Sequence, residues 1–123
     1  MIHLRKETRT KMKKIDVKVR GVYEGIDIGQ LYAVINGDND IHVNGSITVK
    51  KEATDKQNIR IYANLLDKDE HILYVLSSYR SISLKKGSYK SFSMYCAKIE
   101  RFLPMDELDC IEIYGVYNEK DCD

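Results

Sequence analysis

The chain has no tryptophan, a single proline and few cysteines for its 123 residues. Because Pro104 is the only proline, almost every residue keeps a backbone N–H group that can enter a sheet ladder. The lack of tryptophan excludes the Cys–Trp–Cys core that marks true immunoglobulin domains. These absences are compatible with an all-β fold that lacks the immunoglobulin hallmark.

Cysteine and histidine are too scattered for a recognisable metal site. The three cysteines, Cys96, Cys110 and Cys122, form no CxxC pair, and their odd number argues against a complete disulfide framework. Two alternatives stay open for Cys96 and Cys110, namely buried free thiols and a bridge between them. The three histidines form no HxH or HExxH motif. We therefore expect a protein that is not an enzyme and needs no metal or other cofactor.

Long apolar runs and strong net charge are also missing. No stretch of about 18 apolar residues is present, so no transmembrane helix is expected. The formal net charge is only +1, which argues against a polyanion binder by bulk charge. The first residues lack the apolar segment of a secretory signal. We expect a cytoplasmic protein if the chain is complete, and an exported one if an upstream signal was removed.

The two ends of the chain differ in charge. Residues 1–14 carry six basic side chains and one acidic one, which predicts a basic N-terminal tail. Contact with nucleic acid through this tail is an alternative to a simply solvated end, and it is the less favoured one because no aromatic residue is interleaved to stack on bases. Residues 118–123 form an acidic tail. Residues 15–117 remain as a single domain.

Residues 58–97 show the clearest pattern in the chain. Apolar and polar residues alternate over 59–65 and again over 92–96, which is typical of half-buried strands. Residues 72–76 are apolar on both parities, which predicts a strand covered on both faces. Gly87 can take the positive φ of a tight turn between strands. Apolar residues at helical spacing are not sustained in this segment.

The flanking segments repeat the same period. Strands are predicted around 15–19, 31–35, 41–49 and 111–113, with a hairpin turn at 36–40 and a possible bulge at 44–45. Counting gives about seven or eight strands, which favours a two-layer antiparallel β-sandwich. A small closed barrel is the competing architecture.

About forty residues of the central stretch form a recognisable pattern, namely Ala63–Asp67 with the following turn and strand, then Leu84–Gly87 and Phe92. This pattern resembles the FxLYD-type immunoglobulin-like domains of bacterial proteins, which implies an immunoglobulin-like sandwich. Ala63 and Leu66 replace the Phe and Tyr that name the family. The resemblance implies a non-enzymatic module that is usually exported, and the missing signal departs from that.

A candidate binding surface is formed by the strand positions that alternate with the inward, core-facing residues. Arg60, Tyr62, Tyr95, Glu112 and Tyr114 are predicted to leave the core, and the three tyrosines would share one face if their strands lie together in a sheet. The favoured function is a non-catalytic module that binds a protein or a second copy of itself. A module that binds a glycan or small ligand, through the same face or the loop 36–40, is the alternative.

Overall fold

The computed structural model describes residues 13–36, 40–51, 56–78, 81–96 and 105–118. These residues form eight strands and one short 3₁₀ turn, so the all-β prediction is confirmed. In the described part of the chain, no helix is long and apolar enough to cross a membrane. The elements are β1 (Lys13–Val19), β2 (Ile26–Ile35), β3 (Ile41–Val49), β4 (Asn58–Leu66), β5 (Ile72–Ser77), β6 (Ile82–Ser83), β7 (Tyr89–Cys96), η2 (Met105–Glu107) and β8 (Cys110–Tyr117).

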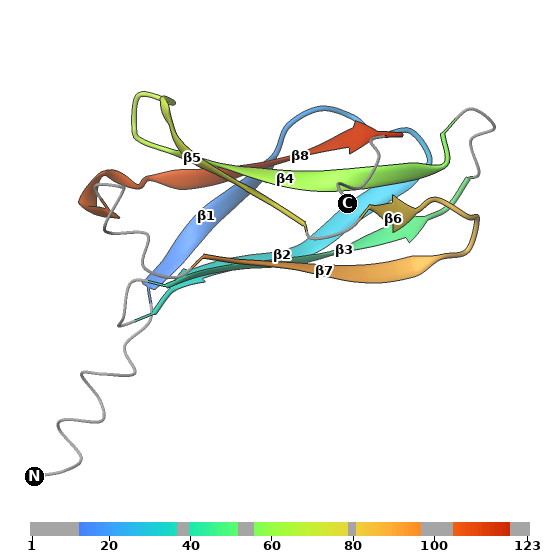
Figure 1. Cartoon of the computed structure of the whole chain (residues 1–123), viewed down its shortest axis with the longest axis horizontal. Helices are drawn as coiled ribbons and strands as arrows, with labels where there is room; N and C mark the ends of the chain where they lie inside the picture. Colours follow the sequence, from blue (N-terminus) through green and yellow to red (C-terminus); the bar gives the residue numbers. More distant parts are fainter. Residues whose placement is uncertain (1–12, 37–39, 52–55, 79–80, 97–104, 119–123) are drawn as a thin grey trace, which may run out of the picture.

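The strands belong to one mixed sheet that curls into a half-barrel. Their order is β5-β4-β8-β1-β2-β3-β7, and β6 pairs with one end of β4. The first part of β1, Lys13–Ile15, is antiparallel to β2, and the second part, Asp16–Val19, is parallel to β8. Figure 1 shows β2, β3 and β7 on one side, β4, β5 and β8 on the other, and β1 crossing between them.

This arrangement departs from the predicted two-layer antiparallel sandwich. The described strands do not form two separate sheets, because β1 hydrogen-bonds to both sides, and they are not all antiparallel, because β1 and β8 run in the same direction. The sheet is not a closed barrel either. Its end strands β5 and β7 come into contact, but among the described residues they form no ladder with each other.

The predicted alternation correctly identifies the core. The concave side of the sheet is filled by aliphatic residues from β3, β4 and β8 together with Phe92 and Met94 of β7. The largest fully buried side chains are Ile41, Val43, Ile47, Ile59, Ile61, Leu65, Ile111 and Ile113. Fully burying each aliphatic side chain of this size contributes about 1.5–3 kcal/mol, so this core is the main source of stability.

The structure contradicts the prediction that residues 72–76 are covered on both faces. β5 is an end strand of the sheet, and Ile72, Tyr74 and Val75 are exposed, Ile72 by 57%. Only Leu76 is buried in this strand. In this end strand, apolar residues of both parities therefore stay exposed to solvent, and only Leu76 joins the core.

The irregularity predicted at residues 44–45 lies on the neighbouring strand. The register between β2 and β3 shifts between Gly29 and Tyr32, so that Gln30 and Leu31 lie opposite Gly45. Gln30 takes a left-handed conformation with φ 51°. Gly45 itself lies under an aromatic ring, because a Cβ atom there would be 2.4 Å from Phe92 Cζ.

A tyrosine hydroxyl extends the ladder between β1 and β8. The strand pairing ends at Val19 and Ile113, and the N–H of Arg20 donates to the carbonyl of Ile113 at 2.7 Å. A continued parallel ladder would join the N–H of Gly115 to the carbonyl of Arg20. The Tyr23 hydroxyl instead lies between these groups, accepting from Gly115 N at 2.8 Å and donating to Arg20 O at 2.8 Å.

Candidate binding surfaces

Four of the predicted surface residues lie on the convex side of β4 and β8. Tyr62 and Tyr114 are direct cross-strand partners, and their rings stack with centroids 5.3 Å apart and planes 13° from parallel. Glu112 lies opposite Asn64, and the Asn64 side-chain amide donates to Glu112 Oε1 at 3.2 Å. The alternating pattern therefore places these side chains on one face.

A cation that the sequence reasoning missed completes this group. Arg20, just beyond the end of β1, places its guanidinium 5.1 Å from the centroid of the Tyr114 ring and 3.5 Å from Glu112 Oε1. Such contacts at an exposed site stabilise the local structure by about 0.5–1 kcal/mol. No sequence signal predicts this neighbour, because it depends on the parallel pairing of β1 with β8.

The face on β4 and β8 is less accessible than the sequence suggests. Arg60 is only 9% exposed, and Tyr62 and Tyr114 are half-buried. The stacking of Tyr62 on Tyr114 and the contact of Arg20 with Tyr114 already use much of the aromatic surface. A partner would therefore find little free aromatic area here.

Tyr95 lies elsewhere. It is on β7, which pairs with β3 at the opposite end of the strand order from β4. Its ring contacts the imidazole of His42, with centroids 4.6 Å apart. The structure therefore brings Tyr62 and Tyr114 together and does not bring Tyr95 to them.

A second surface is formed on the convex side of β2, β3 and β7, and we name it the β2–β3–β7 face. Three of its tyrosines are among the most exposed large side chains, with Tyr32 at 42%, Tyr89 at 55% and Tyr95 at 54%. Neutral polar residues lie between these tyrosines; for example, Asn44 of β3 lies opposite Ser93 of β7 in the strand register. The full set is Tyr32, His42, Asn44, Thr48, Tyr89, Ser91, Ser93 and Tyr95. Ser46 has the same parity, but it is only 5% exposed and its hydroxyl donates to the carbonyl of Gly29 at 3.3 Å.

Charged groups lie at the margins of the β2–β3–β7 face. At one end of the face, the Lys14 ammonium is 5.5 Å from the centroid of the Tyr32 ring. At the other end, Asp27 of β2 lies opposite Thr48 of β3 in the strand register. The Tyr89 hydroxyl donates to Gln30 Oε1 at 2.8 Å. The sequence reasoning missed Tyr32 and Tyr89, although each has the outward parity of its strand.

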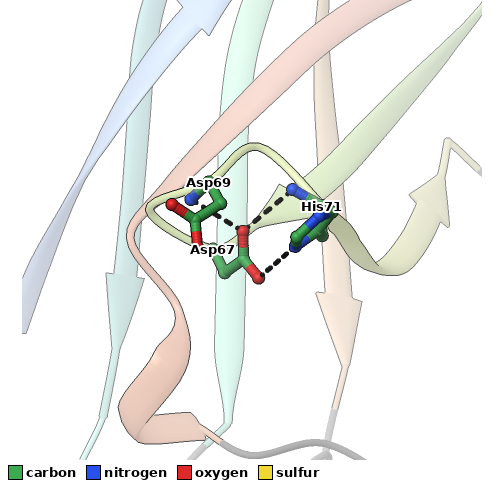
Figure 2. A group of neighbouring side chains, drawn as sticks. All are labelled: Asp67, Asp69 and His71. Atoms are coloured by element: carbon green, nitrogen blue, oxygen red, sulfur yellow. Dashed lines mark hydrogen bonds and ion pairs between the residues drawn. The ribbon is translucent and has the colours of Figure 1, made fainter.

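The turn between β4 and β5 carries a compact group of ionisable side chains (Figure 2). Asp67, Asp69 and His71 each offer one side-chain oxygen or nitrogen atom, and these three atoms lie within 4.8 Å of one another. Asp67 Oδ1 accepts from the N–H groups of Asp69 at 2.9 Å and His71 at 2.8 Å, and His71 Nδ1 is 3.1 Å from Asp67 Oδ2. Both carboxylate oxygens of Asp67 are thus engaged within the turn.

The same bonds alter the acidity of this carboxyl group. The backbone N–H of His71 contributes most, and the side chain of His71 and the N–H of Asp69 add to it, so the pKa of Asp67 lies below its ordinary value. A hollow of about 390 Å³ separates this turn from η2, where Asp106 and Glu107 line it. This exposed acidic hollow is typical of a turn solvated by water.

The described residues include the two ends of the loop 36–40 and the thiol of Cys110. In the hairpin between β2 and β3, the N–H of Asp40 donates to Asn36 Oδ1 at 3.0 Å, and Asp38 lies outside the described residues.

Cys110 is a free thiol, so the bridge to Cys96 is not formed. Partial burial raises the pKa of the Cys110 thiol, which makes it a poor nucleophile. The basic tail lies outside the described residues except for Lys13 and Lys14.

Comparisons of the chain with protein-family models, with curated proteins and with solved structures find no match. The chemistry of its own surfaces is therefore what bears on its function.

Proposed function

We propose that the domain is a non-catalytic protein-binding module and that its binding surface is the β2–β3–β7 face. The observation that carries the proposal is the exposure of Tyr32, Tyr89 and Tyr95 around a centre of serine, threonine and asparagine. Tyrosine supplies a large contact area at low entropic cost and a hydroxyl for hydrogen bonding. Small neutral polar residues supply adaptable hydrogen bonds without the desolvation cost of charges.

The geometry of the strands also supports this surface. β3 and β7 pair over eight consecutive residues without a register shift, from Ile41 opposite Cys96 to Thr48 opposite Tyr89. A regular ladder holds alternate side chains at fixed spacing, so the aromatic rings are preorganised before a partner arrives. Preorganisation lowers the ordering cost of binding and favours a surface that recognises one partner.

A second candidate function is the binding of a glycan by the same face. The Tyr32 and Tyr95 rings can stack on sugar rings, while the amides of Gln30 and Asn44 can hydrogen-bond to hydroxyl groups. Protein binding is favoured because the face is a continuous sheet surface, whereas small-ligand sites are normally concave. Nucleic acid is disfavoured because the face has no basic stripe, with Lys14 only at its margin.

We also propose an immunoglobulin-like architecture of the FxLYD type for this module. The placement of β4, β5 and β8 on one side and of β2, β3 and β7 on the other supports it, with β1 shared between the two sides (Figure 1). Such a scaffold presents sheet faces and loops and uses no buried catalytic group.

The test compares two variants that carry the same kinds of substitution. Tyr32→Ser with Asn44→Arg removes a ring and inserts a charge at the centre of the β2–β3–β7 face. Tyr74→Ser with Ser77→Arg makes matched changes on β5. Affinity capture from cells that express the protein should recover the same proteins with the wild type and the β5 variant, and lose them with Y32S/N44R.

An unchanged capture profile for Y32S/N44R would refute the proposed surface. A glycan array on the same three proteins decides between the two candidates, since a sugar bound by the wild type and lost in Y32S/N44R would favour the glycan. Circular dichroism of both variants controls for loss of the fold.

A further inference from the structure

The free edge of β7 is long, regular and weakly protected. β7 is the last strand in the order, and no described strand pairs with its other edge. Its eight residues, YKSFSMYC, contain no proline and only one charged side chain, Lys90. Natural edge strands are usually shortened, bulged or charged, because a bare edge pairs readily with another strand. The other end strand, β5, has six residues and a register irregularity.

The hydrogen-bonding direction of β7 can be read from the end of its ladder. The N–H of Val49 donates to the carbonyl of Ser88 at 2.9 Å, so this carbonyl points towards β3, whereas the N–H of Ser88 donates to Lys85 O within the turn. Because antiparallel ladders alternate, the backbone groups of Phe92 also point towards β3. Those of Ser91 and Ser93 therefore point towards the free edge.

Space is available beside the middle of this edge. A hollow of about 460 Å³ lies between residues 90–93 of β7 and residues 78 and 81–83, which precede and include β6. Figure 1 shows β7 at the rim of the curled sheet, with β6 across from it. This hollow borders the part of the β7 edge that carries Ser91 and Ser93, and β5 is the described strand that contacts β7 without forming a ladder with it.

The sequence of β7 is nearly the same in both directions about Phe92. Residues 89–95 read YKSFSMY, with tyrosine at both ends and serine on both sides of the central phenylalanine. Two antiparallel copies related by a two-fold axis through Phe92 would place Ser91 opposite Ser93 and Tyr89 opposite Tyr95. Lys90 would lie opposite a methionine, so no like charges meet. Such self-complementarity is what a two-fold interface requires.

We propose that the chain forms a two-fold dimer by antiparallel pairing of β7 with β7 of a second copy. In this register the backbone groups of Ser91 and Ser93 that point away from β3 bond to those of Ser93 and Ser91 of the second copy. The two curled sheets become continuous, and the two β2–β3–β7 faces join into one surface. This inference stands apart from the proposed function, because it rests on the backbone edge of β7 and on its sequence symmetry.

A charge-pair design tests both the dimer and its register. Ser91→Lys with Ser93→Lys places two lysines directly opposite each other at two symmetric positions, which raises the dimer dissociation constant by about tenfold or more. Ser91→Lys with Ser93→Glu places each lysine opposite a glutamate of the second copy and restores the dimer. Ser77→Lys on β5 is the matched control and leaves the dimer unchanged.

Sedimentation equilibrium of the full chain at several concentrations gives the dissociation constants, and circular dichroism confirms the fold. Ser91→Pro provides a test without added charge, because it removes an N–H that does not face β3. We expect a dimeric wild type, a monomeric S91P and the order of affinities stated above. A monomeric wild type, a dimeric S91K/S93K or a lack of rescue by S91K/S93E would overturn the proposal.

The dimer and the proposed function can fail separately. A wild-type monomer that still captures its partners through the β2–β3–β7 face overturns the dimer alone. A dimer in which Y32S/N44R captures the same proteins as the wild type overturns the binding surface alone, because Tyr32 and Asn44 lie on β2 and β3 and not on the β7 edge.

Discussion

Replacing Tyr23 with phenylalanine should destabilise the domain although the ring is retained. The Tyr23 hydroxyl bridges two backbone groups that would otherwise bond directly between β1 and β8. It accepts from Gly115 N and donates to Arg20 O, both at 2.8 Å. The half-buried ring packs edge-on against Tyr117, with centroids 6.0 Å apart. Tyr23→Phe keeps this packing and removes only the relay of hydrogen bonds.

The magnitude follows from the two bonds that are lost. Each neutral hydrogen bond contributes about 0.5–1.5 kcal/mol net, and an unsatisfied buried N–H costs about 1–3 kcal/mol. The carbonyl of Arg20 lies in an exposed segment, so water can replace its partner, whereas the N–H of Gly115 is partly buried. We therefore expect the free energy of unfolding to fall by about 2 kcal/mol, most of it from Gly115.

Urea unfolding followed by circular dichroism measures this loss, and Tyr74→Phe on the exposed strand β5 is the matched control. The control should lie within about 0.5 kcal/mol of the wild type. Amide exchange adds a local readout, because the Gly115 N–H should lose protection in Tyr23→Phe. A stability change as small as that of the control, with Gly115 still protected, would refute the role assigned to the hydroxyl.

Three further predictions concern packing and pH. Gly45→Ala should cost about 1–3 kcal/mol in urea unfolding, because its Cβ would be 2.4 Å from Phe92 Cζ, and a fully stable variant would contradict this packing. Ile113→Ala should cost about 2–5 kcal/mol and Ile72→Ala on exposed β5 less than about 0.5 kcal/mol, and equal losses would contradict the assigned core. The lowered pKa of Asp67 means that its ionised form stabilises the fold above its ordinary pKa of 3.8, and that this stabilisation is lost as the pH falls through the lowered value. The stability difference between the wild type and Asp67→Asn should therefore shrink in acid, and a difference that is constant with pH would count against the turn.

Local periodicity was sufficient to predict the strands and most of the core. Alternation identified Ile59, Ile61 and Leu65 as inward residues, and the structure buries all three completely. Glycine chemistry predicted the turn at Gly87, which has φ 83°. These features depend on neighbours in sequence, and so the sequence carries them directly.

The pairing of distant strands was not predictable in the same way. Parallel contact between β1 and β8 joins Asp16 to Cys110 across most of the chain, and nothing in either segment encodes that choice. The contact of Arg20 with Tyr114 and the separation of Tyr95 from Tyr62 both follow from this strand order. Parity predicts which face a side chain occupies, but only the order of the strands decides which side chains share it.

The position of β8 has a consequence for synthesis of the chain on the ribosome. β8 lies between β4 and β1 in the sheet, yet Cys110–Tyr117 comes latest in sequence among the described strands. The hairpin of β2 and β3 can form early, whereas β4 and the second half of β1 wait with unpaired edges until β8 emerges. Exposed edges of nascent strands favour misassembly, so we expect the stage before β8 has paired to be the one most prone to misassembly.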